Sequence, residues 1–214
     1  MTKCDVLFIQ EHWLSSSQSS QTDHIHSNIL CHAVSGFDNS EVLSGRPYGG
    51  CAILWRSDMV ARVDTITTNS RRICAIKMST DKWNILFINV YMPYEDGEDH
   101  TEDFCMQLSV IEYIISQNAN CHIVIGGDFN VDFSRNWFHT DLLTDFFDKL
   151  SLEPSTRHTD NRVDYTHSFN DIRFTVFDFF ILFRVPFEKA IVSVDVLYDG
   201  DNISDHEPVI MKMC

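Results

Sequence analysis

The chain has 214 residues, of which 44% are hydrophobic and 22% charged, and its formal net charge is −15. This composition is typical of one globular domain or two small ones, and it excludes a disordered chain. The acidic balance also argues against a general polyanion-binding surface, because such binding depends on Lys and Arg. A cluster of acidic residues can instead bind a divalent cation.

The predicted elements are mostly strands. In the first half, strands are expected over 5–10, 28–34, 51–55, 60–66, 73–78 and 84–91, with a polar loop over 15–20. Apolar residues at helical spacing then predict a helix that begins at Thr101 and a second helix over 138–147. A buried strand over 123–125 separates the helices, and late strands are expected over 163–169, 174–183, 191–198 and 208–213. Many strands with few helices predict two packed sheets with the helices outside.

The seven cysteines are an odd number without a Cys-x-x-Cys pair, so neither a zinc site nor a disulfide framework is indicated. No signal peptide opens the chain, and no apolar run is long enough to cross a bilayer. These features predict an intracellular protein with no membrane partner.

The most informative stretch is the strand 123–125 followed by Gly126-Gly127-Asp128-Phe129-Asn130. Side chains two positions apart in an extended segment point to the same side, so Asp128 and Asn130 would project together from the strand end. A carboxylate and a carboxamide in this position could hold a water against an electrophile. An ordinary polar turn explains the same residues equally well, because Gly, Asp and Asn are common in turns.

Three further segments place polar side chains at predicted strand ends: Gln10-Glu11, Tyr91 in Asn89-Val90-Tyr91-Met92-Pro93, and Ser204-Asp205-His206. Each has an ordinary structural explanation when taken alone, such as a solvated glutamate or a surface histidine. Asp178 lies within the apolar run 176–182, where an unpaired carboxylate would be costly. A catalytic histidine needs an acceptor for its second nitrogen, and Asp178 is the candidate partner of His206.

These motifs, in this order, resemble those of the endonuclease/exonuclease/phosphatase superfamily, which includes deoxyribonuclease-I-like enzymes. The resemblance runs from Asp5 to Met213 and implies a single domain over 1–214. The implied fold class is α/β, a four-layer sandwich of two mostly antiparallel sheets flanked by helices. Glu11-His12-Trp13-Leu14 and the Gly-rich segment 45–55 are similar to the endonuclease domains of non-LTR (LINE-type) retrotransposons. The superfamily's first strand, which carries a catalytic Asn, is expected to be missing, so the chain would be a truncated domain.

The resemblance implies a metal-dependent phosphodiester hydrolase, a DNA endonuclease of retrotransposon origin that nicks its target. Mg²⁺ or Mn²⁺ would be the cofactor and DNA the partner, with no obligate protein partner and the nucleus as a candidate compartment. The implied metal ligands are Glu11 and Asp205, and the implied catalytic residues are Asp128, Asn130, His206, Asp178 and Tyr91. Two alternatives stay open: a catalytically inactive remnant that serves as a binding module, and a phosphatase acting on small phosphorylated substrates.

Overall fold

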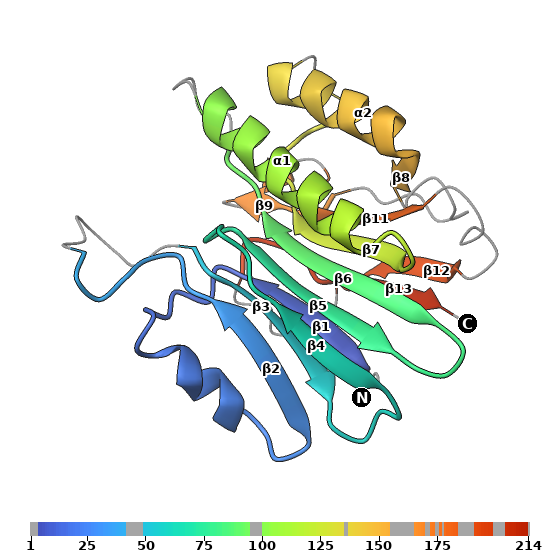
Figure 1. Ribbon diagram of the computed structural model, residues 1–214. Helices are drawn as coiled ribbons and strands as arrows, with labels where there is room; N and C mark the ends of the chain where they lie inside the picture. The colour runs from blue at the N-terminus through green and yellow to red at the C-terminus, as the bar shows by residue number, and fades with distance from the viewer. Residues whose placement is uncertain are drawn as a thin grey trace. The chain divides into compact units, whose positions relative to one another are not determined.

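The computed structural model describes residues 4–41, 49–94, 100–134, 137–154, 165–169, 172–173, 176, 178–183, 191–198 and 204–213. The chain packs as two compact units, whose elements are labelled in Figure 1. Unit 1 lies within residues 1–92 and 109–127, and unit 2 lies within residues 93–108 and 128–214.

Unit 1 contains a small antiparallel sheet in the order β1-β3-β2. Its strands are β1 (Val6–Gln10), β2 (Ile29–Val34) and β3 (Cys51–Arg56). The apolar central strand β3 is buried from Cys51 to Trp55, as expected for a strand covered on both faces. A 3₁₀ helix, η1 (Ser19–His24), contacts β2 and partly replaces the predicted polar loop.

The second group of strands in unit 1 runs in the order β4-β5-β6-β7. These strands are β4 (Arg62–Ile66), β5 (Ile73–Ser79), β6 (Asn84–Tyr91) and β7 (His122–Asp128). Strand β5 contacts both β2 and β3 of the small sheet, so its residues Ile73 to Ile76 are fully buried. Unit 1 is therefore a pair of packed sheets, which confirms this part of the sequence prediction.

A buried amide ties the two sheets of unit 1 together. Asn89 of β6 has no exposed surface, and its Nδ2 donates hydrogen bonds to the carbonyl oxygens of Ile9 (2.8 Å) and Ala52 (2.9 Å). Its Oδ1 accepts a bond from Gln10 Nε2 at 2.5 Å. Gly127 closes over this group with φ +133, and a Cβ there would collide with the Val90 carbonyl oxygen, so glycine is required.

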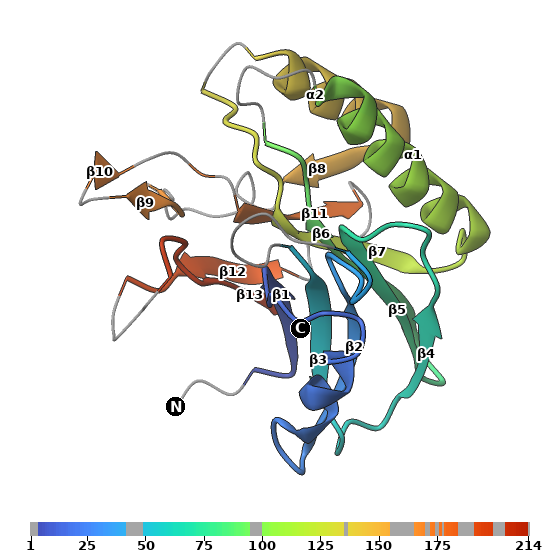
Figure 2. The ribbon, with the colours of Figure 1, turned by 90° about the vertical axis from the view of Figure 1, so that its left-hand side faces the viewer.

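Unit 2 combines a helix with short strand pairs. Helix α2 (Phe138–Leu150) contacts β8 (Leu152–Pro154), which pairs antiparallel with β11 (Asp178–Phe183). Strands β12 (Ile191–Val196) and β13 (Val209–Met213) form a second antiparallel pair, side by side in Figure 2. The two-residue strands β9 (Ser168–Phe169) and β10 (Ile172–Arg173) pair antiparallel. Phe129 and Phe179 stack with their centroids 4.3 Å apart and contribute to the core of this unit.

Helix α1 (Thr101–Gln117) begins at the predicted residue and buries the predicted apolar face of Phe104, Leu108, Ile111 and Ile115. Among the described residues, no helix is both long and apolar enough to cross a bilayer. The late strands are shorter than predicted, and β8 and β10 were not predicted. The expected strand residues 163–164, 174–175 and 177 lie outside the described part of the chain. The six cysteines in the described ranges form no disulfide bond.

Candidate active site

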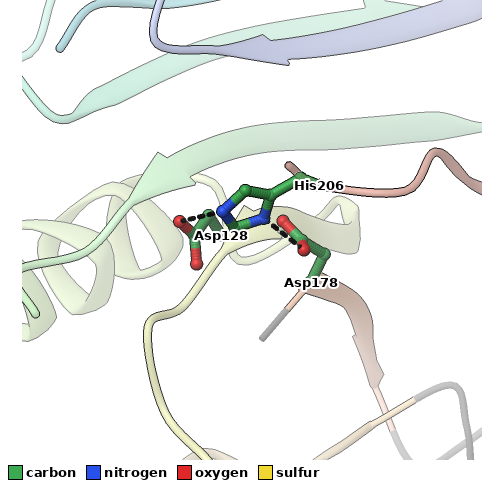
Figure 3. A group of neighbouring side chains, drawn as sticks. All are labelled: Asp128, Asp178 and His206. Atoms are coloured by element: carbon green, nitrogen blue, oxygen red, sulfur yellow. Dashed lines mark hydrogen bonds and ion pairs between the residues drawn. The ribbon is translucent and has the colours of Figure 1, made fainter. Parts of the chain in front are cut away.

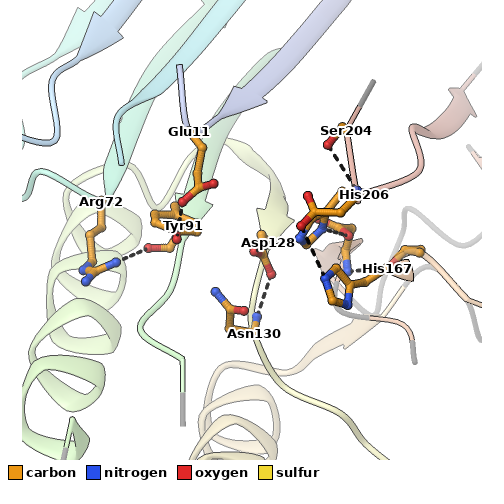
Figure 4. Close-up of polar contacts among 11 residues, drawn as sticks. Glu11, Arg72, Tyr91, Asp128, Asn130, His167, Ser204 and His206 are labelled. Carbon is orange, nitrogen blue, oxygen red and sulfur yellow. Dashed lines mark hydrogen bonds and ion pairs between the residues drawn. The ribbon is translucent and has the colours of Figure 1, made fainter. Parts of the chain in front are cut away.

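Glu11 and Tyr91, two of the predicted site residues, meet in unit 1. Glu11 follows β1 and Tyr91 ends β6, and the Tyr91 hydroxyl donates a hydrogen bond to Glu11 Oε1 at 2.5 Å (Figure 4). Glu11 has φ 54, in the left-handed region that residues other than Gly rarely adopt. Strained conformations of this kind gather at functional sites, because the surrounding structure must hold them.

Arg72, which the sequence analysis did not single out, lies beside the same tyrosine. Its guanidinium carbon is 5.4 Å from the centroid of the Tyr91 ring, and its Nη1 donates to the Tyr91 carbonyl at 3.4 Å. The Tyr91 amide in turn donates to the Arg72 carbonyl at 2.9 Å. We call Glu11, Arg72 and Tyr91 the glutamate–tyrosine cluster. The sequence feature that could have indicated Arg72 is a pair of arginines directly before a buried strand.

Asp128 and Asp178, two further predicted residues, lie next to His206 in unit 2. Its Nδ1 is 2.7 Å from Asp178 Oδ2, and its Nε2 is 3.9 Å from Asp128 Oδ2 (Figure 3). Both carboxylates are well shielded, with side-chain exposures of 13% for Asp178 and 6% for Asp128. The predicted pairing of Asp178 with His206 is therefore present in the structure. We call these three residues the histidine–aspartate cluster.

The charge state of His206 follows from its neighbours. Burial lowers the pKa of His206, but the hydrogen bond and charge of Asp178, with the charges of Asp128 and Asp205, outweigh it and raise this pKa to about 9. At neutral pH the imidazole is protonated, and both nitrogens are donors. Such a group can donate a hydrogen bond to a phosphate oxygen but cannot accept a proton.

This raised pKa predicts a loss of stability in alkali. Because the folded state holds the His206 proton more tightly, the stabilisation is complete below pH 6.5 and disappears as the pH rises through about 9. The loss should be on the order of 3 kcal/mol. Urea unfolding without divalent cations, at intervals from pH 6.5 to 9.5, would measure it against His206→Gln. Parallel pH profiles for the two proteins would contradict the assignment.

Asp128 and Asn130 are both buried, and they form a tight turn. Strand β7 ends at Asp128, whose Oδ1 accepts a hydrogen bond from the Asn130 amide at 2.9 Å, and Asn130 has φ 52. The segment is not extended past Asp128, so the expectation that the two side chains point to the same side does not apply. Asp128 and Asn130 therefore form a polar turn, as one of the two sequence interpretations predicted. A turn here is compatible with a catalytic role, because it fixes the position of the Asp128 carboxylate.

A second histidine lies against the first. His167 pairs with His206 in an antiparallel β-bridge, and the two ring centroids are 4.7 Å apart. Burial and the charge of His206 lower the pKa of His167. No local pattern in the sequence marks His167, because only the folded chain brings it beside His206.

Hydrogen bonds from residues next to the two histidines hold the segments of the histidine–aspartate cluster together. The Thr166 carbonyl accepts from the Glu207 amide at 2.7 Å, and the buried Thr166 hydroxyl accepts from the Asp178 amide at 3.0 Å. The His206 amide donates to Ser204 Oγ at 3.1 Å. Asp205 is largely exposed, and its carboxylate faces His167 Nε2 at 3.8 Å. In this structure Asp205 supports the neighbouring histidine.

The residues present fit a divalent cation in their donor chemistry, since hard cations prefer carboxylate oxygens. Asp128, Asp178 and His206 offer ligand atoms that lie within 4.8 Å of one another. Because a protonated His206 has no free lone pair, it does not ligate in that state. Glu11, the other predicted ligand, brings its carboxylate to the glutamate–tyrosine cluster. That both clusters act on one substrate stays a prediction.

A family model described as the Endonuclease/Exonuclease/phosphatase family matches residues 1–206. The chain belongs to this family. Its members are phosphodiester hydrolases and phosphatases, and divalent metals are general in them. Among curated proteins the chain has no match.

Solved structures of the family show the same fold. A variant of the 3′ phosphatase NExo from Neisseria, bound to a product DNA hairpin, is 17% identical with a TM-score of 0.71, covering 98% of this chain and 89% of that one. The endonuclease domain of TRAS1, a telomere-specific non-LTR retrotransposon, is 15% identical with a TM-score of 0.69, covering 98% and 86%. A mannosyl-6-phosphatase from Bacteroides thetaiotaomicron is 18% identical with a TM-score of 0.67, covering 98% and 85%. The fold class is therefore the predicted deoxyribonuclease-I-like α/β sandwich.

Proposed function

We propose that the chain is a metal-dependent endonuclease of the retrotransposon type, which hydrolyses a phosphodiester bond of DNA. The observation that supports this most directly is the histidine–aspartate cluster. It combines a shielded carboxylate, Asp128, with an imidazolium held by Asp178. A proton acceptor next to a charged hydrogen-bond donor is what hydrolysis of a phosphate ester requires.

In the proposed reaction, Asp128 accepts a proton from the attacking water while the Asn130 carboxamide orients that water. His206 donates a hydrogen bond to a non-bridging phosphate oxygen, where negative charge builds up in the transition state. A bond forms between the water oxygen and phosphorus, the bond from phosphorus to the leaving sugar oxygen breaks, and that oxygen takes up a proton from a solvent water. Asp178 keeps His206 charged throughout, and Asp205 supports the neighbouring His167.

The glutamate–tyrosine cluster is proposed to bind the phosphate and the cation. A bound Mg²⁺ or Mn²⁺ would stabilise the negative charge on the phosphate and on the leaving oxygen. Glu11 would hold the ion, and Arg72 would attract the phosphate. In this structure the Tyr91 hydroxyl donates a hydrogen bond to Glu11. When substrate binds, the hydroxyl would rotate and donate to a phosphoryl oxygen instead. The likeness to TRAS1 and the Glu11-His12-Trp13-Leu14 sequence support the retrotransposon assignment.

A phosphatase activity on small phosphorylated molecules is the second candidate. The net charge of −15 would repel a long polyanion more than a single phosphate ester. The likeness to a mannosyl-6-phosphatase favours the same alternative.

Nicking of a supercoiled plasmid with Mg²⁺, compared with phosphate release from sugar phosphates and inositol phosphates, separates the candidates. We expect nicking that His206→Gln abolishes and that exceeds any phosphate release. Phosphate release without nicking would favour the phosphatase. A protein that is inactive in both assays and still binds DNA would support the inactive binding module.

Replacing Glu11 by Gln should raise the Mg²⁺ concentration required for half-maximal nicking by about 10- to 100-fold, because a neutral amide binds a hard cation weakly. Nicking rates over a Mg²⁺ titration measure this change. Glu102→Gln, at an exposed position in the first turn of α1, is the control and should match the wild type. An unchanged Mg²⁺ dependence in Glu11→Gln would remove Glu11 from the metal site.

A further inference from the structure

The loop after β1 holds a tryptophan in an unfavourable backbone conformation. Trp13 has φ 57 and Glu11 has φ 54, so two residues of this loop are left-handed without being glycine. For a bulky side chain this conformation is a marked outlier. Conformations of this kind persist only where the surrounding structure fixes them, and they cluster at ligand-binding and catalytic positions.

His12 fixes the loop from the inside. Its Nδ1 accepts a hydrogen bond from the Leu14 amide at 3.1 Å, so its Nε2 carries the hydrogen and donates to the Val34 carbonyl at 3.1 Å. The ring packs on Gly50, where a Cβ would collide with it. The Trp13 amide donates to the Gly49 carbonyl at 3.1 Å. With His12 turned inward and anchored, the neighbouring Trp13 is turned toward solvent.

Trp13 is 42% exposed, whereas Trp55 in β3 of the same unit is 8% exposed. The strained position therefore presents an indole at the surface, two residues from Glu11. Gly50, which packs on His12, precedes Cys51, whose Sγ donates to the Arg72 carbonyl at 3.3 Å. Arg72 in turn lies over Tyr91. Trp13 is thus two residues along the same loop from Glu11 of the glutamate–tyrosine cluster.

We propose that Trp13 is a stacking site for a nucleobase of a nucleic-acid strand whose phosphate lies at Glu11, Arg72 and Tyr91. The proposal rests on the proposed function and refines it, since a base-stacking site requires a polynucleotide rather than a sugar phosphate. An exposed aromatic ring can bind single strands with little sequence preference, because every base has a π-face. Strain at Trp13 is then the cost of holding the indole in place for the base.

Binding without turnover tests this directly. A labelled mixed-sequence single-stranded oligonucleotide would be titrated in Ca²⁺ and followed by anisotropy and by tryptophan fluorescence. We expect Trp13→Gly to weaken binding by about 5- to 100-fold, the range for loss of one stacked base. Its midpoint of thermal unfolding should equal or exceed that of the wild type, because glycine relieves the left-handed strain. Trp13→Phe should retain binding within about threefold, since it keeps an aromatic face, but lose most of the fluorescence quenching.

Trp83→Phe is the matched control, because Trp83 immediately precedes the opposite end of β6 from Tyr91. It should bind normally and show the same quenching as the wild type. Equal oligonucleotide affinity for Trp13→Gly and the wild type would overturn the proposal, whether or not the protein cleaves DNA. Slower hydrolysis of methyl p-nitrophenyl phosphate by Trp13→Gly would also overturn it, since that loss would show that Trp13 supports the cluster and does not hold a base. Weakened binding in a protein that cleaves no DNA would support the stacking site while the proposed function fails.

Discussion

His206→Gln is expected to lower kcat for phosphodiester hydrolysis by about 10²- to 10³-fold, the usual loss when one preorganised hydrogen-bond donor to the developing charge is removed. Glutamine can still donate a hydrogen bond to Asp178, but it carries no positive charge. The contact at 2.7 Å would then persist while the stabilisation of the phosphate charge is lost. Steady-state nicking at saturating Mg²⁺ measures kcat, and KM should change much less.

The control for this variant is His26→Gln, an exposed histidine outside both clusters, which should leave kcat unchanged. Asp178→Asn should be nearly as damaging as His206→Gln, and the double variant should be little worse than either single one, because the pair acts as a unit. If His206→Gln keeps kcat within fivefold of the wild type, His206 has no part in the reaction.

Asp128→Asn should reduce kcat by a similar factor of about 10² to 10⁴ for a different reason. The asparagine oxygen can still accept the hydrogen bond from the Asn130 amide, so the turn after β7 should survive. The variant cannot take a proton from water. It also removes one of the negative charges that raise the pKa of His206, so that pKa should fall below about 9. Nicking kinetics and NMR titration of the His206 ring check the two effects separately.

Asp132→Asn is the matched control, since Asp132 is equally buried and accepts hydrogen bonds from the Ser134 amide (2.8 Å) and hydroxyl (2.6 Å) in the following turn. It lies outside both clusters and should keep kcat within a few-fold of the wild type. A loss equal to that of Asp128→Asn would show that the buried turn, rather than the Asp128 carboxylate, is responsible.

The sequence predicted the long, strongly patterned elements well, because their periodicity reports which side chains are buried. Helix α1 begins at Thr101, and β6 has its predicted limits. Short elements carry too few residues for a pattern, so β8, with three residues, was missed. The expectation of an extended segment from Asp128 to Asn130 was wrong, because the Asp128 side chain accepts a hydrogen bond from the Asn130 amide, which an extended segment would leave free.

The residues of the candidate site also include some that the sequence predicted and some that it did not. Residues at strand ends with a recurring neighbour pattern, such as Glu11, Tyr91 and His206, were found from the sequence. The pairing of Asp178 with His206 was also predicted, since a carboxylate in an apolar strand needs a partner. His167 and Arg72 were missed because each is defined by a neighbour that is distant in sequence. The contacts that bring His167 and Arg72 to the two clusters are between residues far apart in the sequence, and no local pattern predicts them.

The amide of Asn89 has a consequence for how this chain tolerates change. It joins β6 to both β1 and β3, and Glu11 directly follows β1 while Tyr91 lies two residues beyond Asn89. The relative position of the two sheets therefore determines whether Glu11 and Tyr91 can contact each other. An apolar residue at 89 could pack as well as the amide and still let the sheets slide. Under the proposed function, a substitution of Asn89 in the core would therefore lower activity in assays in the way that a substitution of Glu11 or Tyr91 does.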